Sequence, residues 1–102
     1  MANFGYSPGT LKGVRIYEEN KGSVTEIKRG VTVSPHKMID MKNDIPSGVS
    51  YLISKGDPDN FVVRITKKGI EIKNESLFEE IKREAYNYGP TMWAEGNFSL
   101  IK

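Results

Sequence analysis

The 102-residue sequence contains no cysteine. This absence excludes disulfide bonds, zinc sites built on thiolates and thiol nucleophiles together. It also fits a reducing compartment, so we expect a cytoplasmic protein. A chain of this length has room for one modest core. We expect residues 1–10, which contain two Gly and a Pro without periodicity, to form a flexible N-terminal arm and residues 11–102 to form a single domain.

Long apolar runs and a strong excess of one charge are also missing. Fifteen Lys and Arg stand against 13 Asp and Glu, for a net charge of +2, and the two signs are interleaved. The apolar runs fall far short of the roughly 20 residues that a membrane-spanning helix needs. The N-terminus lacks the basic and then apolar order of a signal peptide. Nothing in this balance demands nucleic acid or an anionic membrane as a partner.

The sequence lacks the common nucleotide-binding motifs Gly-x-x-x-x-Gly-Lys-Thr and Gly-x-Gly-x-x-Gly. The one histidine, His36, is expected to be a solvated loop residue, and a small hydrolase that uses it is the least favoured function. Residues 57–60 are rich in oxygen ligands but lack the spacing of a calcium loop, so we expect a plain turn. We therefore predict no enzyme, no cofactor and no metal site.

What the sequence does contain is a doubled pattern. It reads Val14-Arg15-Ile16, Lys21-Gly22, Glu26-Ile27-Lys28, and again Val63-Arg64-Ile65, Lys68-Gly69, Glu71-Ile72-Lys73. Both copies predict β-hairpins, with Val14 opposite Ile27 and Arg15 opposite Glu26 in the first, and Val63 opposite Ile72 and Arg64 opposite Glu71 in the second. Such pairs place aliphatic side chains on one face and opposite charges on the other. Hairpin stability accounts for the shared residues without a repeated site.

Alternation predicts three further strands, at residues 31–34, 49–54 and 97–101. Residues 35–41 form a short helical turn or an irregular loop after the Ser34-Pro35 pair. Only residues 75–88 carry a convincing helical signature, with Asn74 or Ser76 as N-cap and Gly89-Pro90 as the stop. The helix's apolar stripe includes Tyr88. The expected core residues are Val14, Ile16, Ile27, Phe61, Val63, Ile65, Ile70, Ile72, Leu77 and Ile81.

These elements predict an α+β fold. We expect a mostly antiparallel sheet of about six strands, built from two β-hairpins, with one C-terminal amphipathic helix packed on it. In the arm, Phe4 and Tyr6 are expected to dock onto their own domain or onto a neighbour.

Binding has better support than catalysis. The hairpin tips carry unpaired lysines, and the segment 86–93 gathers aromatic side chains of the kind enriched at protein interfaces. Trp93 alternatively covers one end of the sheet. The candidate binding residues are Lys21, Lys67, Lys68, Tyr86 and Trp93.

Our first hypothesis is a non-enzymatic module that recognises another protein. We expect a regulatory or inhibitory protein of phage or mobile-element type that acts as a homo-oligomer. The alternative is binding of nucleic acid or a small nucleotide through the basic hairpin tips. No membrane partner is expected.

Overall fold

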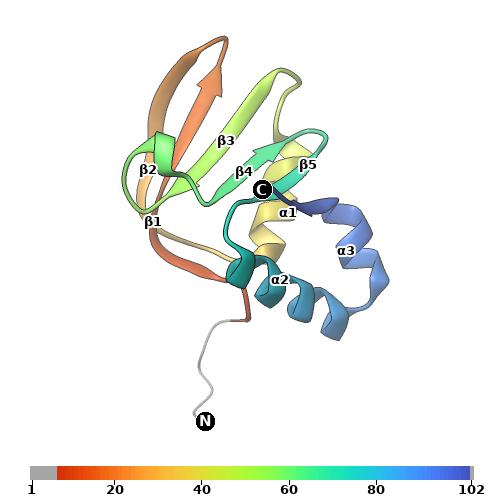
Figure 1. The fold of residues 1–102 in the computed structure, drawn as a ribbon. Helices are drawn as coiled ribbons and strands as arrows, with labels where there is room; N and C mark the ends of the chain where they lie inside the picture. The colour runs from red at the N-terminus through yellow and green to blue at the C-terminus, as the bar shows by residue number, and fades with distance from the viewer. Residues whose placement is uncertain (1–6, 102) are drawn as a thin grey trace.

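A six-stranded sheet and three α-helices make up the fold of residues 7–101, the part of the chain that this computed structural model describes (Figure 1). The strands lie in the order β2 (Ser23–Val33), β1 (Leu11–Asn20), β3 (Val49–Ser54), β4 (Val63–Thr66), β5 (Gly69–Ile72) and β6 (Phe98–Leu100). The helices are α1 (Pro35–Asp44), α2 (Glu75–Tyr88) and α3 (Pro90–Gly96), and a 3-10 turn, η1 (Pro58–Asn60), joins β3 to β4. The predicted α+β class and mostly antiparallel sheet are confirmed.

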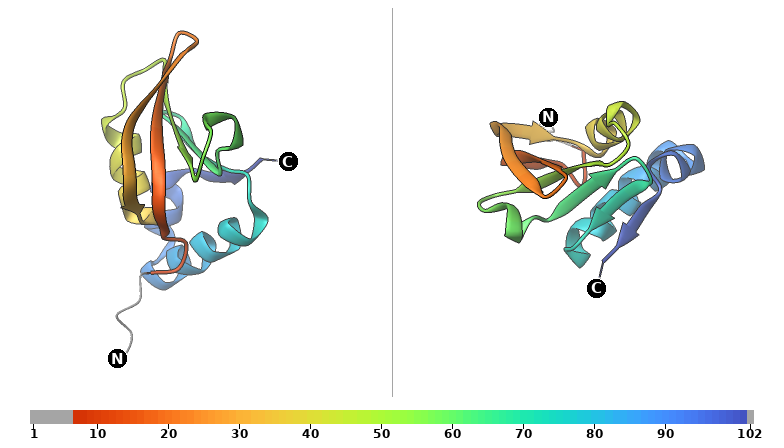
Figure 2. Two further views of the ribbon diagram at one scale, coloured as in Figure 1. Left: turned by 90° about the vertical axis from the view of Figure 1, so that its left-hand side faces the viewer. Right: turned by 90° about the horizontal axis from the view of Figure 1, so that it is seen from above.

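The helices lie together on one face of the sheet, and the far end of the β1–β2 hairpin reaches beyond them (Figure 2). Both β2 and β3 pair antiparallel with β1, so they run in the same direction, and α1 connects them. The parallel pair β5 and β6 is joined through α2 and α3. Strands that run in the same direction need such long connections, and helices usually supply them.

The sequence predicted one helix packed on the sheet, and the structure has three. Helix α1 begins as expected, with the Ser34 hydroxyl accepting a hydrogen bond from Lys37 N at 3.1 Å, but it runs to Asp44. Helix α3 was missed because Gly89-Pro90 was taken only as a stop. Proline is well accepted at the first position of a helix, so Pro90 ends one helix and begins the next.

The second copy of the doubled pattern pairs as predicted, with Val63 opposite Ile72 and Arg64 opposite Glu71. The first copy does not, because Val14 lies opposite Val31 and Tyr17 opposite Glu26. Its turn explains the difference.

Lys21 and Gly22 both have positive φ, 53° and 83°, and form a two-residue turn between Asn20 and Ser23. Two consecutive residues with positive φ are typical of the tight hairpin turn that matches strand twist. In the second hairpin the turn residues are Lys67 and Lys68, one position earlier relative to the Lys-Gly pair. Bulges in the β1–β2 ladder shift the register further. The separate strand predicted at residues 31–34 is instead the end of β2, which runs without interruption from Ser23 to Val33.

The change of register moves Ile27 out of the core. Its side chain is 44% exposed, whereas its counterpart Ile72 is fully buried, so the prediction for Ile27 was wrong. Phe61 is only half-buried and lies under Lys73, whose Nζ is 3.9 Å from the ring centroid. Tyr88 is 67% exposed and does not join the apolar stripe. The other eight predicted core residues are buried, and α1 adds Met38 and Ile39 to them.

The last strand, β6, pairs parallel with β5 at one edge of the chain's own sheet. At the other end of the chain, Gly9 is buried against α2 and its backbone N donates to Glu80 Oε1 at 3.1 Å. Phe4 and Tyr6 lie outside the described residues. Within residues 7–101, the helices are too short or too polar to cross a membrane.

The two hairpins provide a matched test of the register. Ile72→Ala empties a fully buried site and is expected to lower the free energy of unfolding by about 2 to 5 kcal/mol. Ile27→Ala, at the equivalent position of the first copy, should cost less than about 1 kcal/mol. Chemical denaturation of both variants measures the difference. Equal losses would show that Ile27 is buried and that the register given for β1 and β2 is wrong.

Candidate functional site

The structure sorts the five predicted binding residues into three places. Lys21 lies at the tip of the β1–β2 hairpin, Lys67 and Lys68 form the turn between β4 and β5, and Tyr86 on α2 lies near Trp93 on α3. Both hairpin tips are at the same end of the sheet, because Asn20 lies opposite Val49 in β3 and Tyr51 lies opposite Ile65 in β4. Lys21 nevertheless does not line the hollow that holds the other two lysines.

That hollow, the basic hollow, has a volume of about 650 Å³. It lies between the start of β3 and the β4–β5 hairpin, and its lining is formed by Ser47, Gly48, Val49, Ser50, Arg64, Thr66, Lys67, Lys68 and Glu71. Lys67 has a structural partner there, since its Nζ donates to the carbonyl of Ile45 at 3.1 Å, just past the end of α1. A cation at this position favourably meets the negative end of the helix dipole.

Arg64 stands out in the basic hollow. Its Nε is buried and, among the residues that the structure describes, is the only buried side-chain nitrogen or oxygen without a hydrogen-bond partner. The ion-pair partner of Arg64 is Glu71, whose Oε1 lies 3.7 Å from Nε, too far for a hydrogen bond. The guanidinium of Arg64 is therefore attracted to Glu71 without being satisfied by it.

In the first hairpin the corresponding glutamate, Glu26, forms its hydrogen bonds with a different arginine. Glu26 receives two hydrogen bonds of 2.9 Å from Arg29, while Arg15 stays 4.0 Å away. The hydrogen bonds from Arg29 hold the pKa of the Glu26 carboxyl below its ordinary value, with smaller help from the charges of Arg29 and Arg15 and against the effect of burial. The Arg29–Glu26 pair is thus complete by itself.

A pH titration tests this assignment. Arg29→Ala is expected to raise the pKa of Glu26 toward its ordinary value, and Arg15→Ala to raise it less. Because the pKa of Glu26 is lower in the folded chain than in the unfolded one, the pair contributes stability above the unfolded-state pKa. That contribution is lost as the pH falls through the folded-state pKa. Carbon NMR of the Glu26 carboxyl measures the change, and a larger effect of Arg15→Ala would contradict the geometry.

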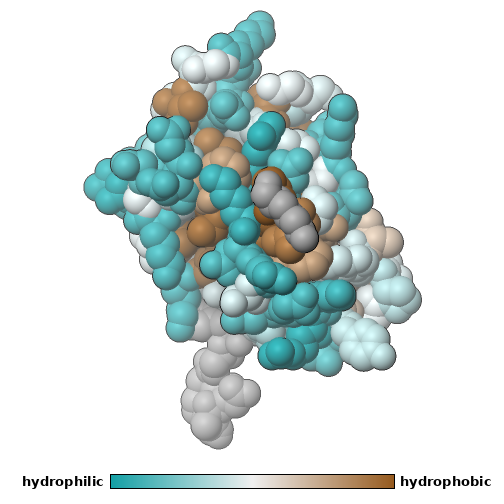
Figure 3. Space-filling view, in the orientation of Figure 1, coloured by the Kyte–Doolittle hydropathy of each residue, from teal (hydrophilic) through white to brown (hydrophobic). Residues whose placement is uncertain are grey.

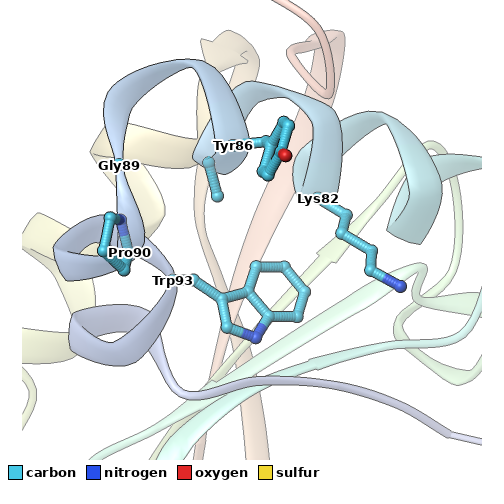
Figure 4. Close-up of a pocket in the computed structure, with 6 residues that line it drawn as sticks. Lys82, Tyr86, Gly89, Pro90 and Trp93 are labelled. Carbon is cyan, nitrogen blue, oxygen red and sulfur yellow. The ribbon is translucent and has the colours of Figure 1, made fainter.

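The aromatic residues line a second hollow, the aromatic hollow, of about 430 Å³ (Figure 4). Lys82, Ala85 and Tyr86 come from α2, and Gly89, Pro90 and Trp93 from the turn and α3. Two aromatic neighbours hold the ring of Trp93. It stacks on Phe98 at 5.2 Å and meets the edge of Phe78 at 5.5 Å between centroids. Its predicted role in covering the end of the sheet and its place in this hollow are therefore compatible.

Tyr86 is the most exposed large aromatic side chain of the described residues, with 89% of its surface open to solvent. It stands between the aromatic hollow and a smaller hollow of about 220 Å³ lined by Glu79, Lys82, Arg83 and Tyr86. Apolar residues elsewhere reach the surface between polar ones (Figure 3).

Sequence reasoning missed a contact between a histidine and a buried glutamate. Glu84 of α2 is buried, and its Oε2 lies 3.0 Å from Nε2 of His36 on α1. The ring of Tyr88 packs edge-on against His36 at 4.5 Å. His36 is consequently a partly buried helix residue and not the solvated loop residue that was predicted. The signal was present in the sequence, since Glu84 falls within the apolar stripe of α2, between Ile81 and Ala85.

The pair ties α1 to α2, and its removal is expected to destabilise the fold. His36→Ala leaves the buried Glu84 carboxylate without this partner and should lower the free energy of unfolding by about 1 to 3 kcal/mol. Lys37→Ala, at the exposed neighbouring position, should change it by less than about 0.5 kcal/mol. A double-mutant cycle with Glu84→Ala isolates the interaction, and additive losses would show that the two side chains do not interact.

No protein-family model, curated protein or solved structure matches this chain. Within residues 7–101, the acidic and histidine side chains do not form a group of three that could hold a metal ion.

Proposed function

We propose that this chain is a non-enzymatic binding module that recognises another protein through the aromatic hollow. The partner contributes an extended segment that carries an apolar or aromatic side chain next to a carboxylate. The observation that supports this most directly is the exposure of Tyr86 beside a hollow whose other side is the rigid ring of Trp93. The regulatory or inhibitory role, the homo-oligomeric state and the phage or mobile-element type stay predictions from the sequence.

The aromatic hollow has the composition of a protein hot spot. Tyrosine and tryptophan are enriched among residues that dominate binding energies, because they bury a large area with few rotatable bonds. Trp93 is already held by Phe78 and Phe98, so little of its freedom remains to be lost on binding. Tyr86 still has almost all of its surface to bury.

The size of the hollow favours a linear segment. Sites for small ligands typically enclose roughly 300–1,000 Å³, and the aromatic hollow, at about 430 Å³, lies at the lower end of this range. It can receive one large side chain or two small ones from a partner. Aromatic-lined grooves that receive short extended segments are a recurring mode of peptide recognition.

The charges around Tyr86 indicate a carboxylate beside that side chain. Lys82 lines both the aromatic hollow and the smaller one, where Arg83 joins it. Glu79 offsets one of these two positive charges, so the rim keeps a positive balance. An acidic residue next to the apolar anchor of the partner would meet Lys82 and gain both orientation and association rate.

Selection from a library of random linear peptides tests the proposal. Bound sequences are expected to combine an aromatic or apolar residue with a neighbouring Asp or Glu. Tyr86→Ala should weaken the binding of a selected peptide about thirtyfold, which corresponds to a hot-spot loss of about 2 kcal/mol. Lys82→Glu should weaken acidic peptides and favour basic ones. Fluorescence polarisation of labelled peptides measures both effects.

Tyr88→Ala is the matched control. Tyr88 is also exposed and lies on the same helix, but it packs against His36 and does not line the aromatic hollow. Its removal should leave peptide affinity unchanged. The proposal fails if no peptide is selected, or if the selected peptides bind Tyr86→Ala as tightly as the unaltered chain.

A further inference from the structure

We propose that the basic hollow binds the phosphate group of a small polyhydroxylated molecule, a sugar phosphate. The inference is independent of the proposed function, because the basic hollow and the aromatic hollow share no lining residue. It narrows the sequence-based alternative of nucleic acid or nucleotide binding to one ligand chemistry at one place.

The unsatisfied Nε of Arg64 supplies the first argument. A buried donor without a hydrogen-bond partner destabilises the fold and calls for an explanation, such as a ligand that completes the site. Glu71 does not provide the bond at 3.7 Å. A phosphate that displaces the Glu71 carboxylate would, because the Arg64 side chain as a whole is 42% exposed and the planar fork of a guanidinium matches a phosphate with two parallel hydrogen bonds.

Lys67 and Lys68 add positive charge to the hollow, and hydrogen bonds hold the side chain of the first and the backbone of the second. Lys67 donates one of its three Nζ protons to the Ile45 carbonyl. This hydrogen bond holds the ammonium at the hollow and leaves two Nζ protons for a ligand. The turn that carries Lys68 is held on both sides. Its backbone N donates to Thr66 Oγ1 at 3.1 Å, and its carbonyl accepts from Asn97 Nδ2 at 2.5 Å. A site that is already ordered loses little entropy when it binds an anion.

The remaining lining fits hydroxyl groups. Ser47, Ser50 and Thr66 contribute hydroxyls that both donate and accept, and the Glu71 carboxylate accepts from a sugar hydroxyl. The lining contains no aromatic ring, so it offers no platform on which a base could stack. These groups favour the phosphate and the sugar of a ligand over its base.

A nucleic acid strand fits the hollow less well than a single phosphate. Glu71 lines it, and Glu19 of β1 lies directly opposite Ser50, so carboxylates stand close to the cations. These negative charges would repel the neighbouring phosphates of a polyanionic backbone. A small ligand with one phosphate and several hydroxyls can place its charge on Arg64, Lys67 and Lys68 and its hydroxyls on the acids.

Isothermal titration calorimetry at low salt with ribose 5-phosphate, inorganic phosphate, ribose and adenosine monophosphate tests the inference. Ribose 5-phosphate should bind more tightly than phosphate or ribose, and the nucleotide no more tightly than ribose 5-phosphate. Arg64→Gln should weaken ribose 5-phosphate at least about tenfold, and Lys68→Gln several-fold. Lys28→Gln, which removes an exposed charge outside the hollow, should leave the affinity unchanged.

Several outcomes would overturn the inference. These are the absence of binding by any probe at millimolar concentration, affinity that Arg64→Gln and Lys68→Gln leave unchanged, and equal losses in Lys28→Gln. Much tighter binding of the nucleotide, or of a short single-stranded oligonucleotide, would assign the hollow to base recognition or nucleic acid instead. If Arg64→Gln does not fold, the exposed Lys68 decides the question by itself. None of these measurements depends on peptide binding at Tyr86.

Discussion

One row of aliphatic side chains sets the structure of both faces of the sheet. Ile16, Ile53, Val63 and Ile72 lie directly opposite one another across β1, β3, β4 and β5, and all are buried beneath the helices. Since neighbouring residues of a strand point to opposite faces, this register also aligns Tyr17, Leu52, Arg64 and Glu71 on the outer face. The packing of the helices on the inner face therefore also determines which residues line the basic hollow on the outer face.

The outer face is partly closed by the chain itself. The Tyr17 hydroxyl donates to the Gly56 carbonyl at 2.6 Å, and Ser54 Oγ donates to the carbonyl of Asp57 at 2.7 Å. These bonds hold the β3–β4 connection over the part of the sheet where Tyr17 and Leu52 are buried. The end of the sheet near Lys67 and Lys68 lacks such a cover in the described structure and contains the basic hollow.

The sequence predicted those features that depend on local pattern. The second hairpin, the strand at residues 49–54 and the helix at residues 75–88 were correct, because alternation, an apolar stripe and an N-cap are visible within a few residues. The first hairpin failed because a one-residue difference in the position of the turn cannot be seen from matching letters. The His36–Glu84 pair joins residues that are 48 positions apart, and only the packing of α1 on α2 brings them together.

The candidate sites show the same division. Lys67 with Lys68 and Tyr86 with Trp93 were each expected as binding residues, but the sequence could not show which residues share a hollow. Arg64 was assigned to Glu71 because the two lie opposite each other. Their pairing is correct, yet facing positions in a ladder do not bring a guanidinium and a carboxylate to hydrogen-bond distance.

The two copies of the pattern differ most in the partners of the arginine and the glutamate that both contain. In the first hairpin the altered register leaves Glu26 within reach of Arg29, which donates a hydrogen bond to each carboxylate oxygen. Both oxygens of Glu26 therefore have a partner. The second hairpin has Asn74, the N-cap of α2, at the place that matches Arg29, and its Lys73 lies over Phe61. Arg64 therefore keeps an unsatisfied donor at the edge of a hollow. An arginine outside the shared pattern, Arg29, thus satisfies the glutamate of the first copy, whereas the arginine of the second copy keeps a buried donor without an acceptor among the described residues.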